Sequence, residues 1–423
     1  MSNERGLFTT ERMYYVKVST EIDDAIQNSA TVLSPIKVCM HVLGTVHNDA
    51  RVMRSATALL EAGFTVTIVD IVEKHSQPSE EEIHGIHVKH ILMPSSFMTT
   101  RFRKWALLRG GWILILGTLR VLQTQADIYH AHDVSGLLPC FIAAQLRRKP
   151  LIFDSHELPM SYMSIRSSWL LALLAFFLAR IIPRCTEVIT VSPPIAQEIC
   201  RRYHIPRVSL IRNVPNYRDV PKSDRLRQHL KLGPDIRIAL YQGKLQHNRS
   251  LDKLVRAAPF LDPNIVVVLM GPSEESTLSQ LKALIASEGV NEQIKILPAV
   301  PYEELLDWTA SAEIGLVVFS QDYSLSIRWC LPNKLFEYLM AGVPVLSSQL
   351  DAVVEVIRTY NVGSIVPTLT PEDIGASINA MLADSASLAT MRCNALQVAR
   401  NEFSWEKESQ QLISLYHRIP FKK

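Results

Sequence analysis

The sequence predicts an α/β fold in which two doubly wound domains, each with a parallel sheet, face each other across a cleft. A chain of 423 residues is too long for one compact core and suits two domains of about 200 residues. Short, almost wholly apolar runs alternate with helical patterns, as expected for parallel strands covered on both faces. The ligands of such sheets bind beyond the carboxyl ends of the strands, so we expect the active site in the cleft.

The polar, proline-bearing segment 213–235 interrupts this alternation and is the expected linker. Residues 1–36 contain no apolar run of signal-peptide length, and we expect them to form a flexible extension. The first Rossmann-like domain is expected over residues 37–215 and the second over residues 216–402.

Thirteen apolar runs are the expected strands, and the segments between them carry helical periodicity. Asp49–Ala62, for example, places Val52, Ala56 and Leu59 on one stripe and stops at Gly63. The expected strands of the first domain are 37–43, 65–71, 86–92, 127–131, 150–153, 187–191 and 208–211, and those of the second are 237–242, 265–270, 293–297, 313–319, 343–347 and 363–366.

Composition excludes several classes of protein. The six cysteines are scattered without a paired motif, which argues against a zinc site or a disulfide framework and favours a reducing cytoplasm. The longest apolar stretch, 169–182, is shorter than the roughly 20 residues that a spanning helix needs. No recognition-helix motif or aromatic platform for nucleic acid is present. We therefore expect a protein that is cytoplasmic or lies peripherally on a membrane.

The first half is basic, with 15 Lys and Arg against 6 Asp and Glu between Leu92 and Arg212. Within it, the segment 101–105 combines basic and aromatic residues, and the segment 164–182 is an apolar helix containing Trp169. Such helices can lie in a membrane interface, which would suit a lipid-linked acceptor. Burial against the sheet explains their apolar faces equally well, so both interpretations stay open.

Two cations follow the first strand of the second half, where Gly243 is succeeded by Lys244 and, five positions later, by Arg249. A diphosphate leaving group gains negative charge as its bond breaks. Fixed cations and helix N-terminal amides aimed at that charge lower the barrier. Taken alone, however, Lys and Arg near a helix start are more often solvated.

A second motif begins at Pro332 and Asn333, runs as a helix to Gly342 and continues into a buried strand. Pro332 stands where a missing N–H is tolerated, so the next amides can face an anion. Glu337, one turn into the helix, would face the cleft and accept hydrogen bonds from two ribose hydroxyls. The alternative is a solvent-exposed helix glutamate.

Polar residues also follow two strands of the first half. His132 and Asp133 follow one strand, with Asp133 the expected N-cap of the next helix, and His156 follows another. Together with His130, Asp154 and Glu157 they invite a metal interpretation, although a lone histidine at a strand end is more often structural. The loop after the first strand contains further candidates for the acceptor side, unless it is only a turn with Asp49 as a helix cap: Gly44, His47, Asn48 and Arg51.

The second half resembles the donor domain of retaining family 4 glycosyltransferases of the GT-B fold. Lys244 and Arg249 fall on the two diphosphate-binding cations of that family, with Lys and Arg exchanged, and Glu337 falls on its ribose-binding glutamate. The resemblance implies a donor domain in the second half and an acceptor domain in the first. It also implies a final helix, 403–423, that crosses back to the first domain, and it identifies His132 with a histidine near the reacting sugar.

The sequence departs from that family at Trp329, where a glutamate that contacts the transferred sugar is expected. This departure puts the sugar contact, and activity itself, in question, although Lys334 can supply a compensating phosphate contact. The resemblance adds further donor-side candidates around the phosphates and the base, namely Gly243, Gly271, Leu297, Pro332, Asn333, Lys334 and Leu335.

The expected reaction is therefore transfer of a sugar, with retention, from a nucleotide-sugar donor, for which we expect a UDP-sugar, to a hydroxyl acceptor in polysaccharide or glycoconjugate synthesis. We expect catalysis to involve His132, Lys244, Arg249 and Glu337, with no metal and no cofactor. Two alternatives remain, which are a nucleotide-sugar epimerase of the same fold and a non-catalytic nucleotide-sugar-binding partner.

Overall fold

In the computed structural model the chain divides into two units, Met1–Ile36 and Lys37–Lys423, and the second unit contains both sheets described here. The structure describes residues 35–73, 78–94, 103–161, 168–246 and 249–420. The expected N-terminal extension lies almost wholly outside these residues, as do parts of the segments 101–105 and 164–182.

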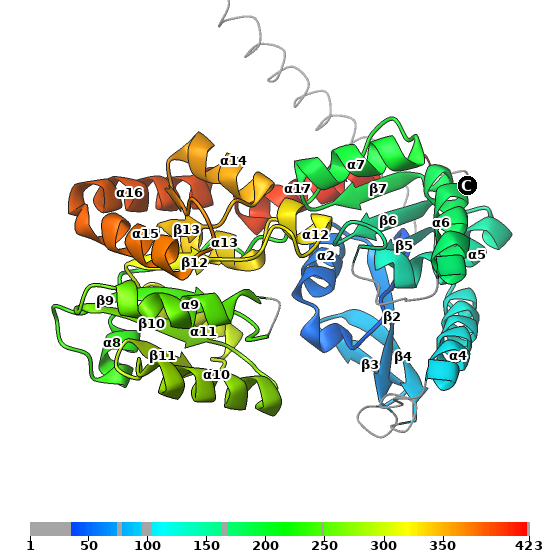
Figure 1. The fold of residues 1–423 in the computed structure, drawn as a ribbon. Helices are drawn as coiled ribbons and strands as arrows, with labels where there is room; N and C mark the ends of the chain where they lie inside the picture. Colours follow the sequence, from blue (N-terminus) through cyan, green and yellow to red (C-terminus); the bar gives the residue numbers. More distant parts are fainter. Residues whose placement is uncertain (1–34, 74–77, 95–102, 162–167, 247–248, 421–423) are drawn as a thin grey trace, which may run out of the picture. The chain divides into compact units, whose positions relative to one another are not determined.

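The first half forms an eight-stranded sheet (Figure 1). All its strand pairs are parallel except β3–β4, which forms an antiparallel edge. Its strands, in spatial order, are β3 (Glu80–Ile83), β4 (Ile86–Met93), β2 (Thr65–Glu73), β1 (Lys37–His41), β5 (Ile128–His132), β6 (Leu151–Ser155), β7 (Glu187–Thr190) and β8 (Ser209–Leu210).

Four helices of the first half pack on one shared core, to which each contributes a buried side chain: Val121, Leu137, Leu178 and Ile195. These helices are α4 (Arg103–Gln123), α5 (Asp133–Arg147), α6 (Ser168–Ile181) and α7 (Pro193–Tyr203). A fifth helix in the described part of this half, α2 (Ala50–Glu61), contacts β2 and the C-terminal helix. The described residues of this half also form two short 3-10 turns, η1 (Val46–Asn48) and η2 (Ile182–Arg184).

The second half forms a six-stranded sheet whose strand pairs are all parallel. Its strands, in spatial order, are β11 (Ile294–Leu297), β10 (Ile265–Met270), β9 (Arg237–Gln242), β12 (Ile314–Val317), β13 (Val345–Ser347) and β14 (Gly363–Ile365). Its helices are α8 (Arg225–Leu230), α9 (Leu251–Ala257), η4 (Ala258–Phe260), α10 (Glu275–Glu288), α11 (Tyr302–Thr309), α12 (Leu325–Trp329), α13 (Asn333–Met340), α14 (Asp351–Tyr360), α15 (Pro371–Ala383) and α16 (Ser385–Asn401).

The predicted α/β fold with two Rossmann-like sheets is confirmed. Every apolar run expected to be a strand forms one, with ends displaced by at most two residues. Strand β3 was not expected, and the segment assigned to the linker contains the short helix α8. No helix among the described residues is long and apolar enough to cross a membrane.

The C-terminal helix α17 (Trp405–His417) packs against α2 of the first half. The Tyr416 ring meets Phe64 edge-on, and its hydroxyl lies 2.7 Å from Nδ1 of His130. Glu408, on the same helix, is buried and bonds both the backbone N–H and the guanidinium of Arg212. These polar and aromatic contacts join the end of the chain to the first sheet.

Candidate functional site

A cavity of about 930 Å³ lies at the carboxyl ends of strands from both sheets. That volume lies in the range of pockets that bind small molecules and cofactors. From the first half it is lined by Asp49, Arg51, His156, Glu157, Ser161, Val191 and Asn213. From the second half its polar lining comes largely from the loops after β9 and β10 and from the start of α13, and includes Gln242, Lys244, Arg249, Asn333, Lys334 and Glu337.

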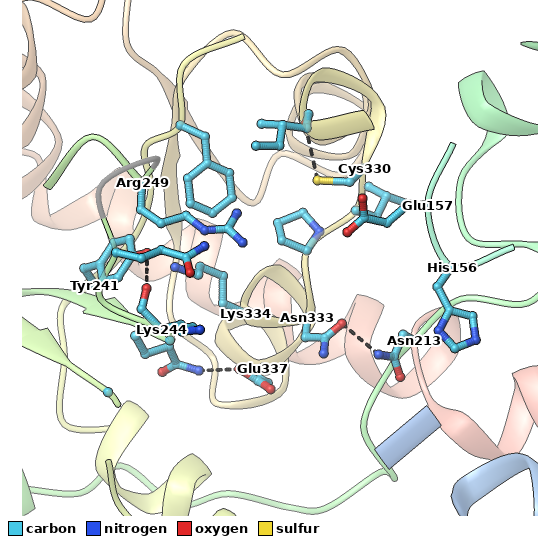
Figure 2. A pocket seen from close by; sticks show the side chains of 18 of the residues that line it. His156, Glu157, Asn213, Tyr241, Lys244, Arg249, Cys330, Asn333, Lys334 and Glu337 are labelled. Carbon is cyan, nitrogen blue, oxygen red and sulfur yellow. Dashed lines mark hydrogen bonds between the residues drawn. The ribbon is translucent and has the colours of Figure 1, made fainter. Parts of the chain in front are cut away.

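Both predicted cations line the cavity together with Glu337, and Figure 2 shows the three residues around one space. Lys244 follows β9 at the surface, and Arg249 stands just before α9. The Arg249 guanidinium lies over the Phe319 ring, 4.8 Å from its centre. The structure therefore brings these three residues together as the sequence predicts, while their roles stay a prediction.

Lys334 is a third cation in the cavity and is only 8% exposed. Its Nζ atom has no hydrogen-bond partner among the described residues and lies over the rings of Tyr241 and Phe319. Burial and the nearby Arg249 hold the pKa of the Lys334 ammonium well below its usual value. A buried amine without a hydrogen-bond partner is costly, and an anion at this position would supply one.

Two glycines let the loops after β9 and β10 approach each other. Gly243 has φ +116°, and Gly271 has φ +153°, in the region that favours glycine. A Cβ atom on Gly271 would lie 2.1 Å from the carbonyl oxygen of Gly243, so no side chain fits there. Both glycines line the cavity beside the cations.

Glu337 is held by Gln242, which is in turn held by Thr309, and neither residue belongs to a sequence motif. Gln242 Nε2 donates to Oε2 of Glu337 at 2.6 Å, and Gln242 Oε1 accepts from the Thr309 hydroxyl at 2.7 Å. These two hydrogen bonds fix the Glu337 carboxylate so that it faces the cavity. Burial raises the pKa of Glu337, although the bond from Gln242 and the charge of Lys334 oppose that effect. The position of Gln242 at the carboxyl end of a predicted strand was the feature of the sequence that could have identified it as a site residue.

The start of α13 faces the cavity with its first turn. Pro332 is the N-cap, so the amides of Asn333 and Lys334 have no intrahelical acceptor. The Asn333 Oδ1 atom accepts a hydrogen bond from Asn213 of the first half at 3.0 Å (Figure 2). Arg54, on α2, in turn bonds the side chain of Asn213. Hydrogen bonds therefore connect Arg54 on α2, through Asn213, to the start of α13, where we predict that the diphosphate binds.

On the opposite wall, His156 lines the cavity above a buried cluster of polar residues. Arg51 donates two hydrogen bonds to Asp154, at 2.9 and 2.7 Å, and both side chains are almost fully buried. Burial would raise the pKa of Asp154, but Arg51 and His156 hold it well below its usual value. Burial lowers the pKa of His156, but Asp133 and Asp154 outweigh that effect and raise it.

His132 is fully buried and is not among the residues that line the cavity in the described part of the chain. It contacts His156, with 3.2 Å between Nδ1 and Nε2, and its ring stacks on His130. His132 therefore has no direct access to the cavity and is connected to it through His156 and, by way of Asp154, through Arg51. The prediction that Asp133 is the N-cap of α5 is wrong, because His132 occupies that position. Asp133 instead accepts a hydrogen bond from the backbone N–H of His156.

The metal alternative has a matching set of donor atoms. The side chains of His130, His132 and Asp154 place one donor atom each within 4.8 Å of the others. Both Asp154 oxygens, however, already accept hydrogen bonds from Arg51, whose positive charge occupies the place of a cation. Burial and His132 hold the pKa of His130 well below its usual value, and burial lowers the pKa of His132 although Asp154 opposes that effect.

The loop after β1 has mainly structural contacts. Asp49 caps α2 by accepting from the amides of Arg51 and Val52, and His47 contacts Glu81 at 2.7 Å. Of the acceptor-side candidates in this loop, Arg51 lines the cavity, whereas Gly44, His47 and Asn48 are not among its described lining residues. The side chain of Asn48 lies outside the description.

Two donor-side candidates are core residues. Leu297 and Leu335 are buried and are absent from the described lining of the cavity. From the segment after β11, Ala299 and Val300 line the cavity instead. Trp329 points away from the site: its indole N–H donates to Asp351 at 3.0 Å, and its ring packs against the first-half core. Position 329 therefore supplies no polar side chain to the cavity.

Two family models match the chain. Residues 222–398 match the model described as Glycosyl transferases group 1, and residues 50–220 match the model described as Glycosyltransferase Family 4. Together they include most of the two sheets and nearly all of the residues that line the cavity.

Curated relatives are distant. A D-inositol 3-phosphate glycosyltransferase of Thermobispora bispora is 27% identical over 236 residues, which are 52% of this chain and 53% of that protein. The chain thus spans about half the length of the inositol-phosphate relatives that it matches. An uncharacterized glycosyltransferase of Methanocaldococcus jannaschii is 23% identical over 85% of this chain and 91% of its own length.

Solved structures share the fold at low identity. A sucrose-phosphate synthase of Thermosynechococcus elongatus superposes with a TM-score of 0.73 at 18% identity, covering 91% of this chain and 99% of that one. The Anabaena HepE protein, solved with UDP and glucose, has a TM-score of 0.67 at 15% identity, covering 90% of this chain and 99% of that one.

Proposed function

We propose that this chain, which belongs to the family 4 glycosyltransferases of the GT-B fold, transfers a sugar from a nucleotide-sugar donor to a hydroxyl acceptor with retention of configuration. The donor of first choice is a UDP-sugar, because HepE is a structural neighbour solved with UDP and glucose. The observation that carries the proposal is the buried Lys334 amine, which has no hydrogen-bond partner among the described residues and shares one cavity with Arg249 and Lys244. Such a site is complementary to a diphosphate.

In this proposal the second half holds the donor. Lys244, Arg249 and Lys334 surround the diphosphate, and the amides at the start of α13 donate to its oxygens. Glu337, fixed by Gln242, accepts from the ribose hydroxyls. As the bond to the sugar breaks, the negative charge that develops on the leaving diphosphate is stabilised by these preorganised groups, which need no metal ion to perform that role.

The acceptor approaches from the His156 side of the cavity, on the same face of the sugar as the departing diphosphate. The diphosphate itself takes the proton of the acceptor hydroxyl, which accounts for transfer with retention. Arg51 supports this proposal because it neutralises Asp154, leaving that carboxylate neither a metal ligand nor an accessible nucleophile. The His132–His156 contact positions the imidazole that faces the acceptor.

Turnover tests the proposal. UDP-sugars labelled in the sugar, incubated with a membrane extract as the acceptor source, are expected to give a labelled product and free UDP. The Lys244→Ala, Arg249→Ala double variant is expected to lose this activity, whereas Lys282→Ala, an exposed lysine on α10 outside the cavity, is expected to keep it. Unchanged activity in the double variant would remove the leaving-group assignment.

The same assay separates the alternatives. The non-catalytic alternative is motivated by Trp329, which leaves position 329 without a carboxylate. Tight binding of a UDP-sugar without turnover by any acceptor fraction would support it. Conversion of the free UDP-sugar to an epimer without acceptor would support the epimerase.

We further propose that the first half contacts an anionic membrane surface through α4 and α6. On α4, Trp112, Ile115 and Leu119 form one exposed stripe, each 51% exposed. On α6, Trp169, Leu173 and Phe176 form another. Neither Arg103–Gln123 nor Ser168–Ile181 contains an acidic residue, and both contain arginine. Exposed aromatic and apolar stripes combined with positive charge suit an anionic interface.

Sedimentation with vesicles tests this contact. The protein is expected to bind vesicles of phosphatidylglycerol and phosphatidylcholine, and to bind pure phosphatidylcholine vesicles weakly. The Trp112→Ser, Trp169→Ser variant is expected to lose vesicle binding while keeping its affinity for UDP, since both residues lie outside the cavity lining. Equal recovery of the wild type and the variant with anionic vesicles would contradict the contact.

A further inference from the structure

Three carboxylates line the cavity in the described part of the chain. Two of them already have contacts that fix their position. Asp49 accepts from two backbone amides as the cap of α2. Glu337 accepts from Gln242 beside the cations. The third, Glu157, accepts one long hydrogen bond, from the Ser326 hydroxyl to Oε2 at 3.3 Å, and its Oε1 has no partner among the described residues. Glu157 therefore retains most of its capacity to bind a ligand.

Glu157 follows β6 and reaches the cavity from the first half. In Figure 2 its carboxylate points into the space that Arg249 enters from the other side. Burial and the nearby Asp133 raise the pKa of Glu157, while Ser326 and Arg249 act in the opposite direction. A ligand between them meets cations at one end and a hydrogen-bond acceptor at the other. A sugar attached to a diphosphate has that distribution of groups.

We infer that Glu157 is a specificity-determining residue that accepts hydrogen bonds from hydroxyl groups of the transferred sugar. The inference rests on the proposed function and extends it to the contact that Trp329 cannot make. A carboxylate has two oxygens and can bind two neighbouring hydroxyls at once, so it distinguishes sugars by the position of those hydroxyls.

The surroundings of Glu157 preorganise this contact. Ser326 lies on α12, three residues before Trp329, and its hydroxyl bridges the two halves by accepting from the Leu158 amide at 3.3 Å while it donates to Glu157. Trp329 anchors the same helix through Asp351. Helix α12 therefore positions a carboxylate from the β6 loop, although it provides none itself at position 329.

Binding measurements on Glu157→Gln and Glu157→Ala test the inference. The probe is whichever of UDP-glucose, UDP-galactose and UDP-N-acetylglucosamine the wild type binds most tightly, with UDP as the reference. Both variants are expected to bind UDP within twofold of the wild type. Both are expected to bind the UDP-sugar about 10- to 100-fold more weakly, the usual effect of losing hydrogen bonds to a charged group. Glu355→Gln, an exposed glutamate on α14, is the control and is expected to change neither affinity.

Deoxy donors make the test specific. For the wild type, removing one bound hydroxyl from the sugar is expected to weaken binding about tenfold, and Glu157→Ala is expected to abolish that difference. A variant that keeps the wild-type preference for every hydroxyl would overturn the inference, as would an equal loss of UDP and UDP-sugar affinity. If the wild type binds UDP-sugars no better than uridine, the proposed function itself fails, which is a different outcome.

Discussion

The Nζ atom of Lys334 lies 3.4 Å from the centre of the Tyr241 ring. The Phe319 ring faces the same Nζ at 5.0 Å and the Arg249 guanidinium at 4.8 Å. Aromatic rings attract cations, but more weakly than a negatively charged partner does. Among the described residues neither side chain has a hydrogen-bonded carboxylate, so an anionic ligand would supply the partner that both lack.

Replacing Lys334 with methionine separates binding from stability. We expect Lys334→Met to bind UDP at least tenfold more weakly, because a cation beside the diphosphate is lost. We expect its free energy of unfolding to be equal to or higher than that of the wild type, because the substitution removes a buried amine that has no hydrogen-bond partner in the described part of the chain. Calorimetric titration and urea denaturation measure the two quantities. Lys282→Met is the control, and full UDP affinity in Lys334→Met would contradict the expectation.

Binding of a diphosphate should also take up protons. Burial and Arg249 lower the pKa of Lys334, and a bound diphosphate raises it again. Protons are therefore taken up on binding at any pH between the two values, and UDP affinity falls as the pH rises through the pKa of the bound state. Titrations in buffers with different ionisation enthalpies count these protons. Lys334→Met should take up fewer protons than the wild type, and equal uptake by the two would exclude Lys334 as the acceptor.

Most of the fold was predictable because buried parallel strands are apolar along their whole length. Strand β3 escaped detection because Glu80, Glu81 and Glu82 form a polar edge paired only with β4. The cap of α5 was misassigned because Asp133 has φ +55° and accepts from a residue 23 positions later. Neither a long-range hydrogen bond nor an unusual backbone angle leaves a periodic pattern in sequence.

The site was predictable where residues are close in sequence. Lys244 and Arg249 flank one loop, and Glu337 lies one turn into a helix that begins with a recognisable motif. The burial of His132 and the bond from Gln242 to Glu337 depend on packing between distant segments. Glu157 stands next to His156 in the sequence, but only the structure shows that its one hydrogen bond, from Ser326, is long, whereas the bond from Gln242 to Glu337 is short.

The buried Arg51–Asp154 ion pair should contribute more to the free energy of unfolding than an exposed ion pair does. Arg51→Met leaves Asp154 buried without its cation, and we expect a loss of about 3–5 kcal/mol in the free energy of unfolding. Arg201→Met breaks an exposed pair with Glu198 and is expected to change little. Urea denaturation at neutral pH makes the comparison, and similar losses in both variants would contradict the expected role of burial.

Position 271 should tolerate no side chain, because the loops after β9 and β10 meet there. We expect Gly271→Ala to cost about 1–3 kcal/mol, because its Cβ would overlap the Gly243 carbonyl. Since both loops line the cavity, UDP affinity should fall as well. Gly233→Ala is the control, because a Cβ there meets nothing within 4 Å. Thermal unfolding with and without UDP tests both effects, and wild-type behaviour of Gly271→Ala would show that the loops can separate freely.

The most direct test compares UDP with uridine, which lacks the diphosphate. The wild type is expected to bind UDP at least 100-fold more tightly than uridine, since three cations face the phosphates. The Lys244→Ala, Arg249→Ala variant is expected to bind uridine as the wild type does and to lose most of its preference for UDP. A variant that keeps the full preference would show that the diphosphate does not lie between these two side chains.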